Sequence, residues 1–198
     1  MNILTQPLPQ SVKVRGEVFN LNTDYRAGVR FELMVERGEE NVYNLLCPFF
    51  PSGCPQDVSA ALEAAIWFYS CGSPPEDGAK PGGKPAYSFD TDAETIFADF
   101  WQYYGIDLSA EEMHWFIFRA LLMGLPEESG FKKRIYYRTC ELRDLPKKER
   151  ERIVKIRKQI EIAPRSGRQM TLSERNAKMR EFVKRRSSET QKGGESNG

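Results

Sequence analysis

Apolar residues recur at helical spacing along most of the chain, and the clearest case lies in residues 88–125. One stripe of a helix over 93–104 holds Ala93, Ile96, Phe97, Phe100, Trp101 and Tyr104. Gly105 then ends this helix, and 106–108 turn the chain. From Met113 to Met123 only His114 and Arg119 are polar, so the second helix is apolar almost all round. Such a helix belongs in the middle of a bundle or under a partner.

The ends of this second helix also carry sequence signals. Ser109 and Glu112 have the spacing of a capping box, in which each side chain satisfies a backbone N–H at a helix start. Gly124 and Pro126 are residues that end a helix and prevent it from resuming. Because the pair is so rich in aromatic residues, we expect at least two of the three tryptophans to be buried.

Similar signals predict the rest of the fold. Two short alternating segments flank Arg15-Gly16 and predict a hairpin over 12–19. Further helices are expected at 24–38, 39–46, 57–71, 129–140 and 146–162, and the Gly/Pro-rich residues 72–86 read as a surface loop. The sequence therefore predicts a mainly α fold: a compact multi-helix domain over 1–164 with a short N-terminal β-hairpin.

Charge divides the chain in a way that its net charge of +1 conceals. Residues 1–130 carry 8 Lys/Arg and 19 Asp/Glu, a net of −11, whereas 131–198 carry 21 and 9, a net of +12. The basic end predicts a helical, partly disordered interaction tail: a linker and basic amphipathic helix over 165–186, then a disordered tail over 187–198.

The composition also bears on location. The first ten residues hold neither the basic residues nor the apolar run of a signal peptide, and no apolar stretch reaches the roughly 18–20 residues of a membrane span. Four irregularly spaced cysteines beside apolar residues indicate buried free thiols: Cys47, Cys54, Cys71 and Cys140. A cytoplasmic protein without a membrane segment is expected.

Candidate catalytic patterns are few. Glu111-x-x-His114 has the spacing of a di-iron ligand pair, but such a site needs a second histidine and His114 is the only one. A Ser–His or Cys–His pair would depend on the same residue, and the chain has neither a nucleophile elbow nor a glycine-rich phosphate loop. The acidic residues of 90–99 are more typical of charges that complement a helix dipole. We therefore expect a non-enzymatic protein without metal or cofactor.

Binding residues are expected on two segments. The basic segment 147–186 suits either an acidic or amphipathic protein partner or nucleic acid, and its interspersed glutamates favour the protein. The residues expected to bind a partner share large apolar or basic side chains at helical spacing: Trp115, Phe118, Arg119, Leu172, Met179, Phe182 and Val183.

Several ordered motifs resemble one known family. The opening segment is LTQPLPQSVKVRGEVFNLNTDYRAGVRFE, and it is followed in order by AALEAAIWFYSCG, YSFDTDAETIFADFWQYYGIDL, MHWFIFRALLMGLP and FKKRIYYRTCEL. This series resembles the bacteriophage "gene-product fifteen" family of long-tailed phages of Gram-positive hosts. The resemblance covers about Leu4 to Pro164, and it leaves out the insertion at 72–86 and the tail after Pro164.

The resemblance implies a mostly helical, non-catalytic protein encoded among tail genes. It implies a chaperone of tail assembly that binds the tape-measure protein, with the major tail protein as a further candidate partner. A homo-oligomer is a separate possibility that the resemblance does not address. Assembly would take place in the cytoplasm of the host cell. Two alternatives remain: a nucleic-acid-binding accessory protein that uses the basic tail, and a structural component of the virion.

Overall fold

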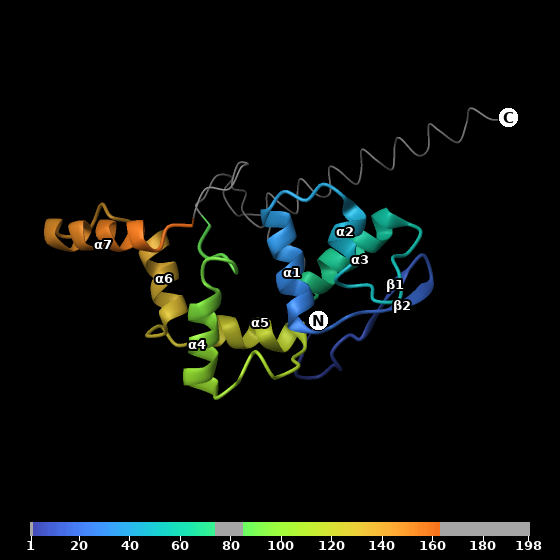
Figure 1. Cartoon of the computed structure of the whole chain (residues 1–198). Helices are drawn as coiled ribbons and strands as arrows, with labels where there is room; N and C mark the ends of the chain where they lie inside the picture. Colours follow the sequence, from blue (N-terminus) through green and yellow to red (C-terminus); the bar gives the residue numbers. More distant parts are fainter. Residues whose placement is uncertain (1, 74–84, 163–198) are drawn as a thin grey trace, which may run out of the picture. The chain divides into compact units, whose positions relative to one another are not determined.

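The computed structural model describes residues 2–73 and 85–162 (Figure 1). In these residues the chain forms a two-stranded antiparallel sheet and seven helices. The elements are β1 (Ser11–Val14), β2 (Glu17–Asn20), α1 (Tyr25–Glu36), α2 (Val42–Leu46), α3 (Val58–Tyr69), α4 (Ala93–Tyr104), α5 (Trp115–Gly124), α6 (Gly130–Thr139) and α7 (Lys147–Gln159). The mainly α fold with an N-terminal hairpin is thus confirmed. The predicted tail, at 165–186 and 187–198, lies outside the described residues.

The described residues fall into two compact units, 2–23 with 38–73 and 24–37 with 85–162. In the first unit the hairpin pairs Val12 with Phe19, and its two-residue turn has positive φ at both Arg15 (51°) and Gly16 (90°). This turn geometry matches the twist of paired strands, and Gly16 adopts it readily. The side chains of Val12 and Val14 are buried, and β1 packs against α3.

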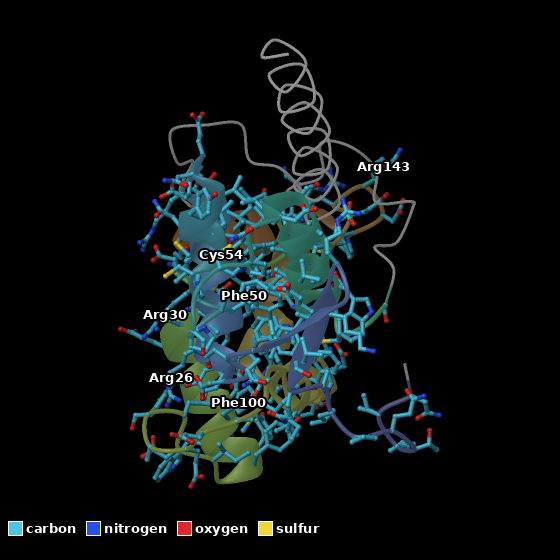
Figure 2. All side chains as sticks on the ribbon, turned by 90° about the vertical axis from the view of Figure 1, so that its right-hand side faces the viewer. Arg26, Arg30, Phe50, Cys54, Phe100 and Arg143 are labelled. Atoms are coloured by element: carbon cyan, nitrogen blue, oxygen red, sulfur yellow. The ribbon has the colours of Figure 1, made fainter. Side chains whose placement is uncertain are left out.

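Helix α3 organises the core of the first unit. Asp57 caps its first turn by accepting a hydrogen bond from the Ala60 N–H, and Arg15 of the hairpin turn donates to the same carboxylate at 2.6 Å. These hydrogen bonds hold the pKa of Asp57 below its usual value. On the buried side Phe49 meets Phe68 edge to face at 5.7 Å between ring centroids. Phe50, labelled in Figure 2, is also buried and meets Phe19 in the same manner.

Stacked aromatic rings form the core of the second unit. Phe118 of α5 lies between two parallel partners, with its ring centroid 4.6 Å from Tyr25 of α1 and 5.2 Å from Phe100 of α4. Trp115 is fully buried and packs against Gly28 of α1, which has no side chain to obstruct the indole. Offset stacks of this kind stabilise beyond their buried area by about 0.5–1.5 kcal/mol each. The apolar face of α5 therefore holds α1 and α4 together.

Two buried carboxylates attach α6 to α4, which lies beside it in Figure 1. Asp92 is fully buried and accepts hydrogen bonds from Arg134 at 2.9 Å and from Arg138 at 2.6 and 2.8 Å. Burial raises the pKa of Asp92, but the Arg138, Ser88 backbone and Arg134 hydrogen bonds outweigh it and leave the pKa lowered. Asp99 accepts from the backbone N–H groups of residues 130 and 131 and so caps α6.

The start of α5 differs from the prediction. The helix begins at Trp115, and its N-cap is His114, whose Nδ1 accepts a hydrogen bond from the Phe116 N–H at 3.1 Å. Ser109 instead donates to Asp107 within the turn that precedes the helix. The capping box at 109 and 112 was therefore wrong: Asp107 holds Ser109 in a turn over 108–110, and the helix begins only after His114 pairs with Asp24.

The prediction for the tryptophans was also wrong. Trp115 is 0% exposed, whereas Trp67 is 40% and Trp101 57% exposed. Trp101 belongs to the apolar stripe of α4, but that stripe is wider than the surface that packs against the rest of the unit. The sequence spacing placed Trp101 in the apolar stripe of the helix, but it could not show which part of that stripe packs against the rest of the unit.

The predicted domain boundary at 164 lies beyond the described residues and stays a prediction. Within 2–73 and 85–162 every helix is too short or too polar to cross a lipid bilayer.

Candidate interaction surface on helices α4 and α5

Helix α4 presents both a buried and an exposed apolar side. Ile96 and Phe100 are covered, while Phe97 is 41% and Trp101 57% exposed. Phe97, Trp101 and Tyr104 follow one another at i, i+4 and i+7, so their side chains share one side of the helix. Two large rings left in water in this way cost hydrophobic free energy, and a partner that covered them would recover it.

Helix α5 continues the exposed apolar surface. Ile117 is 44% exposed, and Leu121, one turn later, is half-buried. Tyr104 joins the two helices: its hydroxyl donates to the Leu121 carbonyl at 2.8 Å, and burial raises the pKa of its phenol. We define the α4–α5 face as these five residues: Phe97, Trp101, Tyr104, Ile117 and Leu121. The two helices that carry it are crossed in Figure 1.

The sequence-predicted partner residues on α5 lie elsewhere. Trp115 and Phe118 are 0% and 1% exposed, so their rings build the core and do not reach the surface. Arg119 is half-buried, donates to the Tyr87 hydroxyl at 2.8 Å and holds its Cζ 5.6 Å from the centroid of the Trp115 ring. The other predicted partner residues lie outside the described residues: Leu172, Met179, Phe182 and Val183.

The segment that builds the α4–α5 face carries mostly negative charge, while basic side chains reach it from α1 and α6: Arg26 donates to the carbonyls of 108, 109 and 111, and Lys132 pairs with Glu127. Residues 85–131 hold nine acidic side chains and a single arginine, and two of the nine are the buried Asp92 and Asp99. The other seven are exposed or half-exposed: Asp90, Glu94, Asp107, Glu111, Glu112, Glu127 and Glu128. Two of the seven are paired, Asp90 with Arg37 and Glu127 with Lys132, so the field of the other five acts most strongly on a partner that approaches the face.

Particular carboxylates lie next to the face along the chain. Glu94 precedes Phe97 by one helical turn on the same side of α4. Asp107, Glu111 and Glu112 belong to the segment that joins α4 to α5, and hydrogen bonds from Ser109 hold the pKa of Asp107 below its usual value. Glu127 follows the end of α5 and is paired with Lys132 at 4.0 Å. An acidic margin around an apolar surface favours a partner with basic edges.

The geometry at His114 bears on the metal hypothesis. Residues 111–114 precede α5, so Glu111 and His114 do not share a helix face as the spacing had implied. His114 accepts a backbone hydrogen bond through Nδ1 and meets the Phe116 ring edge to face at 5.1 Å between ring centroids. Across 2–73 and 85–162, His, Cys, Asp and Glu side chains form no group of three suited to hold a metal ion.

Helix α7 carries the opposite charge. Its thirteen residues hold seven Lys or Arg and two Glu, and six of the seven basic side chains are exposed. Ile153 anchors the helix by burial, and Arg157 donates to the Tyr137 and Cys140 carbonyls of α6. The basic segment predicted from the sequence thus begins on an ordered helix.

The exposed rings of α4 were not identified as a binding surface from the sequence. The available signal was the width of its stripe, which runs over Ile96, Phe97, Phe100 and Trp101, and the structure covers only part of that width.

Comparison with known proteins gives one match. A family model described as "Bacteriophage Gp15 protein" matches residues 4–162, which is most of the chain. Among curated proteins and among solved structures, none matches.

Proposed function

The chain belongs to the bacteriophage Gp15 protein family, and from this membership we propose that it is a non-enzymatic tail assembly chaperone that binds the tape-measure protein. The observation that carries the proposal is the α4–α5 face, where the rings of Phe97 and Trp101 remain 41% and 57% exposed side by side on one helix. Exposed apolar patches of this kind are characteristic of binding surfaces. Assembly of a tail would place the protein in the host cytoplasm.

The physical task of such a chaperone fits this surface. A tape-measure protein is a long helical chain with apolar faces that must stay covered until the tail tube forms around it. A crossed pair of helices with exposed aromatic side chains can pack against the apolar face of such a chain. The major tail protein and a second copy of this chain are further partners within the same proposal.

The direct test is co-expression of the full chain with overlapping tagged fragments of the phage's tape-measure protein. We expect the untagged chain to co-purify with at least one helical fragment and to keep that fragment soluble. Tape-measure fragments that neither bind nor gain solubility would contradict the proposal. A structural component, the alternative role, would also remain in purified particles, so mass spectrometry of virions separates the two roles.

A second candidate function rests on α7. Its exposed basic side chains suit phosphate contacts, which release counterions and make binding depend steeply on salt. The two glutamates of α7 and the acidic α4–α5 face weigh against a surface that tracks a phosphate backbone. A titration with duplex DNA at low and at physiological salt decides between the chaperone role and the nucleic-acid role. Tight, salt-sensitive DNA binding that survives Trp101→Ala would favour the nucleic-acid role.

A further inference from the structure

We propose that the α4–α5 face is a docking site for one amphipathic helix with basic edges, supplied by another protein. The inference rests on the proposed function in that it names the chemistry of the partner segment. It concerns a surface on the second unit alone, and each step follows from residues of that unit.

The first step concerns the shape of the ligand. Phe97, Trp101 and Tyr104 span eight residues of α4, about 10 Å along its axis. A partner helix presents apolar side chains at i, i+3, i+4 and i+7 over the same distance, so two turns of it match the three rings. An extended strand would need unpaired backbone groups to add to, and the face is built of helices, whose backbone groups are already bonded.

The second step concerns the rigidity of the surface. Tyr104 is tied to the Leu121 carbonyl, and the adjacent Phe100 stacks on Phe118 at 5.2 Å between centroids. Beneath them Asp99 caps α6. The exposed rings therefore stand on a fixed support, which reduces the ordering cost of binding.

The third step concerns charge. Seven accessible carboxylates lie in the segment that builds the face, and two of them are paired, Asp90 with Arg37 and Glu127 with Lys132. Arg119 already bonds Tyr87 and lies over Trp115. Arg26 donates to the backbone carbonyls of 108, 109 and 111, which leaves the other five carboxylates to a partner. An acidic helix brought to the face would meet like charges, whereas lysines or arginines beside its apolar stripe would meet Glu94 and the carboxylates of 107–112. Charge complementarity selects the basic-edged helix from amphipathic helices in general.

The test uses the full chain and three synthetic peptides of about 18 residues, which allow several helical turns. One has leucine at helical spacing with lysine elsewhere, the second replaces each lysine with glutamate, and the third scrambles the first. Fluorescence anisotropy of the labelled peptides measures their affinities. We expect the lysine peptide to bind at least about tenfold more tightly than either control, with a loss of affinity as salt is added.

Substitutions locate the binding site. Trp101→Ala should weaken the lysine peptide by about tenfold or more, as truncation of a central aromatic anchor commonly does. Trp67→Ala removes an equally large, exposed indole from α3 and should leave the affinity unchanged. Equal losses in both variants, or a loss only with Trp67→Ala, would overturn the proposed site. Circular dichroism on each variant confirms that the fold is kept.

Charge reversal tests the acidic edge separately. Glu111→Lys with Glu112→Lys should weaken the lysine peptide and strengthen the glutamate peptide, while Glu17→Lys with Glu40→Lys, two exposed residues of the other unit, should do neither. A glutamate peptide that binds as tightly as the lysine peptide, and loses affinity with Trp101→Ala, would overturn the basic-edge requirement.

The remaining occupants are outcomes of the same experiment. A chain that sediments as a dimer, and that the lysine peptide converts to monomer, would assign the face to a second copy and overturn the proposal. If Phe182→Ala with Val183→Ala raises the affinity of the full chain for the lysine peptide severalfold, the chain's own C-terminal segment competes for the α4–α5 face. That result would overturn the proposal of a partner from another protein.

The proposed function fails separately. Peptide binding without any tape-measure binding leaves the docking site and rejects the tape-measure role. Tape-measure binding that is insensitive to Trp101→Ala keeps the tape-measure role and rejects the α4–α5 face as the docking site.

Discussion

Gly28 of α1 and Trp115 of α5 pack without room for a single methyl group between them. A Cβ built on Gly28 would lie 2.4 Å from Cε3 of the indole, far inside the distance that two carbon atoms tolerate. Trp115 is fully buried and stacks on Phe118, so the indole cannot move aside without disturbing the aromatic core. The contact fixes how closely α1 approaches α5.

The first prediction concerns this contact. Gly28→Ala would raise the intrinsic helix propensity of α1 by up to about 1 kcal/mol. We nevertheless expect a net loss of about 1–3 kcal/mol in the free energy of unfolding, because the new methyl group overpacks the core. Urea denaturation measures it.

Gly124→Ala provides the matched control at the end of α5. There a Cβ would meet only the Tyr104 hydroxyl, at 3.6 Å, an ordinary van der Waals contact. This variant should be neutral or slightly stabilised. A Gly28→Ala protein at least as stable as the Gly124→Ala protein would show that α1 and α5 are not packed as described.

The second prediction concerns Arg138, whose side chain is only 6% exposed and donates to Asp92 through two nitrogens. Arg138→Ala leaves the Asp92 carboxylate buried with one fewer arginine partner, so the free energy of unfolding should fall by about 3–5 kcal/mol. Arg143→Ala is the control, because Arg143 extends into solvent and its pair with Glu141 is exposed on both sides (Figure 2). Arg143→Ala should change the free energy of unfolding by no more than about 0.5 kcal/mol. Urea denaturation measures both variants, and equal losses in Arg138→Ala and Arg143→Ala would contradict a structural role for the buried pair.

The third prediction is the pH dependence of the same pair. The pKa of Asp92 is lowered in the folded protein, so the carboxylate contributes stability above the pKa of an unfolded aspartate, about 3.9. That contribution is lost as the pH falls through the folded pKa. The difference in unfolding free energy between the wild-type protein and Asp92→Asn should therefore be largest near neutral pH and shrink below about pH 4. A difference that stays constant down to pH 3 would contradict it.

Sequence patterns located the elements well where the deciding interaction is local. Asp57 caps α3, Gly105 ends α4 with a φ of 66°, and the hairpin turns at Arg15-Gly16, all as the residue types indicate. Each signal acts within a few residues of the chain, so it survives whatever the tertiary structure does.

The failures share a different cause, because each depended on tertiary contacts. Ser109 lost its capping role to Asp107, and the helix start moved to His114, which pairs with Asp24 from a distant part of the chain. Trp101 lies on a stripe that only its neighbours could show to be half covered. Asp92 and Asp99 resembled surface charges of one helix start, yet both attach α6. Spacing shows which side of a helix is apolar, but what covers that side is a property of the whole unit.

The fourth prediction uses the different exposure of the tryptophans. The double variant Trp67→Phe with Trp101→Phe keeps only the buried Trp115, so its emission should be blue-shifted and resistant to iodide. Trp115→Phe keeps the two exposed rings and should be red-shifted and readily quenched. Stern–Volmer slopes compare the two, and similar slopes would contradict the burial of Trp115 or the exposure of Trp101.

The last prediction concerns the sole histidine. His114 caps α5 by accepting the Phe116 N–H at Nδ1, so His114→Ala should lower the free energy of unfolding by about 0.5–2 kcal/mol. His114→Asn keeps a side-chain acceptor suited to an N-cap and should restore most of the loss. Chemical denaturation of the three proteins gives the ranking, and a tape-measure pull-down should show unchanged binding in both variants. A His114→Asn variant as unstable as His114→Ala would contradict the capping role. Loss of phage viability in a His114→Ala protein that still folds and binds its partner would reveal chemistry at His114.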